Sequence, residues 1–156
     1  MYQTILVPLD GSPRAEVILP HVEDIAVRLQ SKVILVQVVE PLFQFINPAL
    51  YETTIQTDVI QESIRDFKNR QESIVAYLAD HQASLQKKGV TATTIVEQGP
   101  VVETIISVAQ RENVDLIAIA SHGRTGLSRV FYGSVAAGLM QKIDRPILIV
   151  RSRNQG

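Results

Sequence analysis

Short apolar runs alternate with amphipathic stretches along this 156-residue chain, and that order constrains the fold more than any other feature. The runs have the composition of buried strands, and they lie at 5–9, 33–39, 91–97, 116–120 and 146–150. Strands that alternate with helices form parallel pairs through right-handed crossovers. The sequence therefore predicts an α/β fold, with an open five-stranded parallel sheet and helices on both faces.

Apolar residues at helical spacing predict four connecting helices. The first begins at Ser12-Pro13, where Ser suits the cap and Pro the first position, and it reaches about Leu29. Pro20 lies inside that pattern, so it either kinks this helix or marks a later start. The other three cover about 59–88, with Gly89 as the stop, 101–109, and the segment that opens at Gly133-Ser134.

Residues 42–58 lack a clean period, which indicates either a mobile lid or part of an interface. Phe43, Phe45 and Leu50 favour a segment that packs. Residues 151–156 are expected to form a frayed tail. No linker or repeat divides the chain, so residues 1–156 are predicted to form one domain.

Composition excludes several classes of function. A net charge of −1 provides no basic field, which argues against a nucleic-acid partner. The absence of cysteine excludes disulfides, thiolate metal sites and a catalytic Cys, and it fits a cytoplasmic protein. The N-terminus lacks signal-peptide features, and no apolar run approaches the roughly 20 residues that span a bilayer. We expect a cytoplasmic protein without membrane contact.

The stretch from Asp115 to Met140 has the strongest functional pattern. An apolar strand leads into a loop of small and polar residues that holds Gly123 and Gly126, and Gly133-Ser134 then opens a helix. Glycine-bearing loops and helix N-termini offer free N–H groups to a phosphate. Turn geometry alone is the other explanation for these glycines. The pattern is neither a Walker A loop nor the G-x-G-x-x-G dinucleotide motif.

A second polar loop, Pro8-Leu9-Asp10-Gly11, follows the first strand. In open parallel sheets, ligands bind outside the carboxyl ends of the strands, where the strand order reverses. Asp10 in this loop is therefore a candidate ligand-binding residue. Capping the turn before the first helix is the alternative role for Asp10.

The glycine stretch resembles the nucleotide loop of the universal stress protein family, in its ATP-binding branch. That branch carries a Gly, two residues, a second Gly, nine residues, and Gly-Ser or Gly-Thr. In this chain Gly123 and Gly133-Ser134 match, whereas Ala120 takes the place of the first glycine. The resemblance extends over nearly the whole chain. It implies an adenine nucleotide alpha hydrolase-like sheet in the order 3-2-1-4-5, in which both polar loops flank one crevice.

The resemblance also implies roles for individual residues. Asp10 would contact the nucleoside, and the main chain of Val38 would bond the adenine edge. Arg124 or Arg129 could reach a γ-phosphate, and His122 lies in the same loop. The ligand would be ATP, ADP or AMP, with Mg²⁺ or Mn²⁺ carried by the phosphates, because the sequence has no carboxylate cluster for a metal. The expected binding set comprises Pro8, Leu9, Asp10, Val38, Ala120, His122, Gly123, Arg124, Gly126, Gly133, Ser134 and Val135.

The apolar strand Ile147–Val150 would invite uncontrolled pairing if it lay at the edge of the sheet. Burial against a second copy would remove this hazard, and the family resemblance implies such a homodimer.

The predicted function is that of a nucleotide-dependent stress-response switch or sensor, whose protein partner is left open. No general base is evident, so any ATP hydrolysis should be slow. One alternative is a dimeric interaction protein that no longer binds nucleotide. Ala120 favours it, whereas the intact spacing from Gly123 to Ser134 argues against it. Another is a nucleotidyl transferase, but the sequence shows neither a His-x-x-His motif nor a Lys-bearing catalytic loop.

Overall fold

The computed structural model describes residues 1–41, 56–122 and 133–152, with the backbone alone described for residues 56, 57 and 122. Five parallel strands form one sheet in the order β3-β2-β1-β4-β5, which confirms the predicted fold and strand order. The strands are β1 (Thr4–Pro8), β2 (Lys32–Val39), β3 (Thr91–Gln98), β4 (Leu116–His122) and β5 (Ile147–Ser152).

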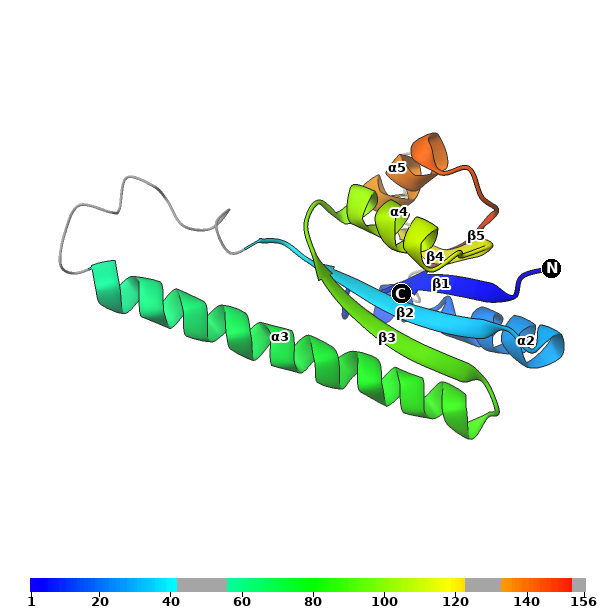
Figure 1. Cartoon of the computed structure of the whole chain (residues 1–156), viewed down its shortest axis with the longest axis horizontal. Helices are drawn as coiled ribbons and strands as arrows, with labels where there is room; N and C mark the ends of the chain where they lie inside the picture. Colours follow the sequence, from blue (N-terminus) through cyan, green and yellow to red (C-terminus); the bar gives the residue numbers. More distant parts are fainter. Residues whose placement is uncertain (42–55, 123–132, 153–156) are drawn as a thin grey trace.

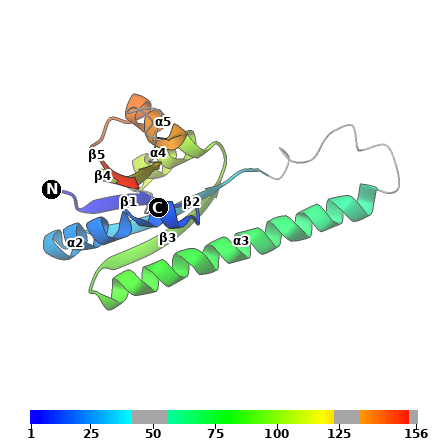
Figure 2. The same ribbon diagram turned by 180° about the vertical axis from the view of Figure 1, so that it is seen from behind.

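Helices cover both faces of this sheet. They are α1 (Pro13–Glu16), α2 (Leu19–Leu29), α3 (Gln56–Lys87), α4 (Val101–Arg111) and α5 (Ser134–Lys142). Figure 1 shows α4 and α5 on one side of the sheet and α2 and α3 on the other, and Figure 2 shows the same layers from behind.

Each face of the sheet has its own hydrophobic core because successive strand residues point to opposite faces. Ile5 and Val7 of β1 belong to the core beneath α2 and α3, where Val22 and Leu78 are fully buried. Leu6 lies between them in sequence and belongs to the core beneath α4 and α5, with Ile105. The sheet is thus buried on both sides, as its continuous apolar strands predicted.

The first predicted helix is two helices. Ser12 caps α1 as expected, because its Oγ accepts a hydrogen bond of 3.2 Å from the N–H of Ala15. The chain then leaves the helix after Glu16 and starts α2 at Leu19, with Pro20 in its first turn. Proline lacks the N–H that a helix interior needs, and the first turn is where it is tolerated.

Other boundaries also differ from the sequence prediction. α3 begins at Gln56, so residues 56–58 are helical, while the rest of the expected lid or interface segment lies outside the described residues. β4 continues past Ala120 to His122. It does so because Ser121 and His122 pair with Arg151 and Ser152, two residues expected in the tail that belong instead to β5.

α3 is much longer than the sheet it covers. It has 32 residues, or about 48 Å. Its later part packs on the sheet through Leu78 and Leu85, whereas none of the residues 58–77 falls in the buried class. Figure 1 shows the first half of α3 extending past the carboxyl ends of the strands. We call residues 58–73 the overhang.

None of the described helices has the length and apolar character needed to cross a membrane.

Candidate functional site

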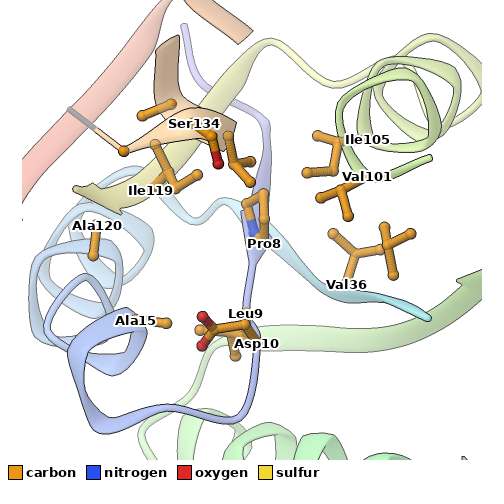
Figure 3. Close-up of a pocket in the computed structure, with 14 residues that line it drawn as sticks. Pro8, Leu9, Asp10, Ala15, Val36, Val101, Ile105, Ile119, Ala120 and Ser134 are labelled. Atoms are coloured by element: carbon orange, nitrogen blue, oxygen red, sulfur yellow. The ribbon is translucent and has the colours of Figure 1, made fainter. Parts of the chain in front are cut away.

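A cavity of about 180 Å³ lies at the carboxyl edge of the sheet, where the strand order reverses between β1 and β4. This is the place at which open parallel sheets bind ligands. Figure 3 shows its walls converging around Pro8 from β1, β2, β4 and the nearby helices. The lining residues are Pro8, Leu9, Asp10, Ala15, Val36, Val38, Val101, Ile105, Ile119, Ala120, Gly133, Ser134, Val135 and Ala136.

One wall of the cavity is apolar. Val36 of β2 faces Val101 and Ile105 of α4, and these three side chains stand together on one side of Pro8 in Figure 3. Val36 and Ile105 belong to the core beneath α4, so their positions are fixed by packing. Such a wall suits a flat ring whose faces are weakly polar.

The loop after β1 forms a second wall. The N–H of Leu9 donates a 2.8 Å hydrogen bond to the carbonyl of Val36, which holds this loop against β2. Asp10 follows and is exposed. Its Oδ1 accepts hydrogen bonds from the N–H of Ser12 at 2.9 Å and from the Ser12 hydroxyl at 2.6 Å. Asp10 therefore shapes the turn into α1 and also lines the cavity.

The start of α5 supplies hydrogen-bond donors. Its cap is Gly133, with φ 78° and ψ 153°, a conformation that favours glycine. Among the residues that the structure describes, no side chain caps this helix. Between described residues, the first N–H that bonds back along the chain is that of Ala137, to the carbonyl of Gly133 at 3.0 Å. The N–H groups of Ser134, Val135 and Ala136 thus have no intrahelical acceptor, and all three residues line the cavity.

A contact between α1 and α3 fixes the position of Ala15, another lining residue. The hydroxyl of Tyr77 donates a 3.0 Å hydrogen bond to Oε1 of Glu16, next to Ala15. Nε2 of His81 lies 3.5 Å from the same oxygen, and its ring meets Tyr77 edge-on. Burial raises the pKa of Tyr77, and the hydrogen bond to Glu16 and the charges of Glu16 and Asp10 raise it further.

The structure brings together most of the residues expected in a nucleotide site. Those that line the cavity are Pro8, Leu9, Asp10, Val38, Ala120, Gly133, Ser134 and Val135. His122 ends β4, and its side chain is not described. Gly123, Arg124, Gly126 and Arg129 lie outside the described residues.

Sequence reasoning missed six lining residues, which are all apolar: Ala15, Val36, Val101, Ile105, Ile119 and Ala136. Apolar residues at strand and helix spacing predict a core position whether or not a cavity lies beside them. Val36 and Ile119 sit near the carboxyl ends of strands, and this was the signal available for them.

Within the described part of the chain, no three His, Cys, Asp or Glu residues gather closely enough to hold a metal ion.

Comparison with known proteins places the sequence and its fold in one family. The sequence matches the universal stress protein family over residues 1–151. The chain belongs to this family. Universal stress protein MJ0577 of Methanocaldococcus jannaschii is 28% identical over an alignment of 159 positions, which covers 99% of this chain and 98% of that protein.

Several solved structures have the same fold as this universal stress protein over nearly its whole length. The structure of MJ0577 has a TM-score of 0.79 at 27% identity and covers 99% of both chains. A universal stress protein in complex with cAMP has a TM-score of 0.66 at 21% identity over 97% of this chain and 98% of its own. One from Arabidopsis thaliana with AMP bound has a TM-score of 0.67 at 16% identity over 97% and 93%. The last two share the fold.

Proposed function

We propose that this universal stress protein binds an adenine nucleotide in the cavity and acts as a cytoplasmic stress-response switch. The observation that carries this proposal is the uncapped start of α5. Three N–H groups, those of Ser134, Val135 and Ala136, lie at a cavity whose other walls are an apolar surface and the Asp10 loop. Nucleotide complexes of proteins with the same fold support it, since one holds cAMP and another AMP.

The cavity offers a suitable surface to each part of a nucleotide. The base would lie against Val36, Val101 and Ile105, with the main chain of Val38 within reach of its polar edge. The ribose would lie near Asp10. The phosphates would accept hydrogen bonds from the N–H groups at the start of α5, where the helix dipole favours negative charge. A divalent cation would bind through the phosphates.

The residues that line the cavity favour ligand binding over catalysis. Among the described lining residues, Asp10 is the only one with a carboxylate, and one of its oxygens is held by Ser12. Hydrolysis would need a group that positions and deprotonates a water molecule. We therefore expect at most slow ATP turnover.

Ser134 provides a test that leaves the fold intact. It is the first residue of α5, and proline is favoured at this position. Ser134→Pro removes one N–H and the hydroxyl, whereas Ser134→Ala removes only the hydroxyl. Hydrogen bonds to charged groups contribute about 1.5–3 kcal/mol, so S134P should weaken ATP or AMP binding about 10- to 100-fold.

Isothermal titration of both variants with ATP, AMP and cAMP, with and without Mg²⁺, measures this difference. S134A should bind nearly as well as the wild type. Equal affinities for S134P and the wild type would contradict phosphate binding at α5.

Ala120 supports a second candidate, a dimeric interaction protein without nucleotide. Its methyl group lines the cavity where the ATP-binding pattern has glycine. If this group excludes the ligand, the wild type should show no thermal shift with ATP, whereas Ala120→Gly should acquire one. A wild-type shift that A120G does not increase would reject this candidate.

We also propose a homodimer through β5. This strand ends the sheet, and Ile147, Leu148, Ile149 and Val150 are only partly buried within one chain. Sedimentation at micromolar concentration should show association, and Ile149→Lys should weaken it because an edge charge opposes strand pairing. A wild-type monomer would contradict this proposal.

A further inference from the structure

The overhang of α3 carries an apolar stripe that the described residues of its own chain leave partly exposed. The stripe residues recur four and three positions apart, which is heptad spacing: Ile60, Ile64, Phe67, Gln71, Ile74 and Leu78. The last two pack in the core beneath α2 and α3. Ile64 is 49% exposed, and Ile60 and Phe67 are only partly buried. The same stripe therefore continues from the core onto the solvent-exposed part of α3.

We infer that this stripe pairs antiparallel with the overhang of a second copy. Single helices without tertiary contacts are marginal in water, so covering the stripe would stabilise the overhang. A partner helix with the same heptad seam supplies matching knobs and holes. This contact is separate from the β5 edge and does not depend on nucleotide binding.

The sheet decides the direction of pairing. From Ile74 onward the stripe faces its own sheet, so a partner helix can lie only along the overhang. In a parallel pair, both sheets would stand at the same end of the seam and compete for the same space. In an antiparallel pair they stand at opposite ends.

Packing and charge together select one register. Placing Ile64 opposite the partner's Phe67 uses only the free part of the stripe. Lys68 and Arg70 flank the stripe. In this register Lys68 lies near the partner's Gln61, and Arg70 lies near the partner's Ser63. A shift of one heptad toward the sheet would set Lys68 against the partner's Lys68 and Arg70 against the partner's Arg70, and like charges repel. That shift would also require Ile74, which already packs in the core. A shift of one heptad the other way would set Phe67 opposite the partner's Thr57, a polar residue in an apolar seam.

Engineered thiols can detect this register because the chain has no cysteine. In the double variant Ser63→Cys/Arg70→Cys, residue 63 of one chain would lie beside residue 70 of the other. Within one helix these positions are seven residues, about 10 Å, apart, which is too far for a disulfide. Any disulfide must therefore join two chains. The matched control is Glu62→Cys/Asn69→Cys, which has the same spacing on the outer face.

Mild oxidation without nucleotide, followed by a non-reducing gel, should give a covalent dimer for S63C/R70C and little for E62C/N69C. Each single variant should link weakly. Singles that link as well as the double variant would indicate a register in which residue 63 or residue 70 meets its own copy, and this would overturn the inference. Absence of linkage in S63C/R70C would also overturn it, as expected if another segment of the chain covers the stripe.

Sedimentation provides a second measurement. Ile64→Asp places a charge in the seam, while Asn69→Asp adds the same charge on the outer face. I64D, combined with I149K to weaken pairing through β5, should associate about tenfold more weakly than N69D in the same background. Equal association of the two variants, with helix content confirmed by circular dichroism, would overturn the inference. Loss of nucleotide binding in S134P would leave these results unchanged.

Discussion

Asp10 and Ser12 are joined by two hydrogen bonds to a single carboxylate oxygen. The N–H of Ser12 donates to Oδ1 at 2.9 Å, and its hydroxyl donates at 2.6 Å. Oδ2 accepts no hydrogen bond from the residues that the structure describes. One oxygen thus shapes the turn into α1, while the other remains available at the cavity.

Asp10→Asn separates these two roles. An amide oxygen can still accept from Ser12, so the free energy of unfolding should change little. The loss of the negative charge should weaken the hydrogen bonds to ribose by about 1 kcal/mol, or about fivefold in the Kd for AMP. Titration calorimetry and urea unfolding measure the two effects. A large loss of stability in D10N with unchanged affinity would make Asp10 a turn residue only.

Tyr77 should make stability depend on alkaline pH. Burial and the nearby carboxylates raise its pKa in the folded protein above the ordinary value near 10. The unfolded chain therefore loses this proton at lower pH than the folded protein does, so this contribution to stability falls as pH rises above about 10. Tyr77→Phe lacks it. Urea unfolding at pH 9 and pH 11 should show Y77F less destabilised at the higher pH. A constant difference between the two pH values would contradict this account.

Gly138 of α5 lies against Val102 of α4. A Cβ added at Gly138 would stand 2.8 Å from Cγ2 of Val102 and 3.3 Å from its Cγ1. Alanine improves helix propensity by up to about 1 kcal/mol, but overpacking costs about 1–3 kcal/mol. Gly138→Ala should therefore lower the free energy of unfolding by about 1 kcal/mol. In a Val102→Ala background the same change should be neutral or stabilising, which a double-mutant cycle would reveal.

Gln37 of β2 holds a buried polar atom without a partner. Its Oε1 accepts no hydrogen bond among the described residues. Removing an unsatisfied buried acceptor stabilises a protein by about 1 kcal/mol when the shape is kept. Gln37→Met should raise the free energy of unfolding by this amount, while Gln98→Met, at an exposed position, should not. A loss of stability in Q37M would indicate that a water molecule satisfies the amide.

Sequence patterns were sufficient for the order of strands and helices because each strand is a continuous apolar run and each helix keeps its period. They were less informative about boundaries that depend on partners. Ser121 and His122 are polar, which predicts a loop, yet they extend β4 because Arg151 and Ser152 lie beside them. Pro20 alone does not decide between a kink and a break after α1, since one proline can either kink a helix or begin one.

The residues of the cavity also differ in how far the sequence predicts them. Polar and glycine residues identified the Asp10 loop and the start of α5, because these residue types have few structural roles at such places. Val101 and Ile105 could not be separated from core residues, because hydrophobicity does not tell whether a side chain faces another side chain or a cavity. Their role depends on the crossing of α4 over the sheet, which periodicity does not specify.

The donors that the start of α5 presents at this cavity are backbone N–H groups. Many different side chains can be attached to such a backbone without altering it, provided that Gly133 keeps its left-handed conformation. A family built on this plan can therefore drift far in residue identity and still keep one ligand. Distant members are better recognised by the path of the chain around the sheet edge than by matching letters.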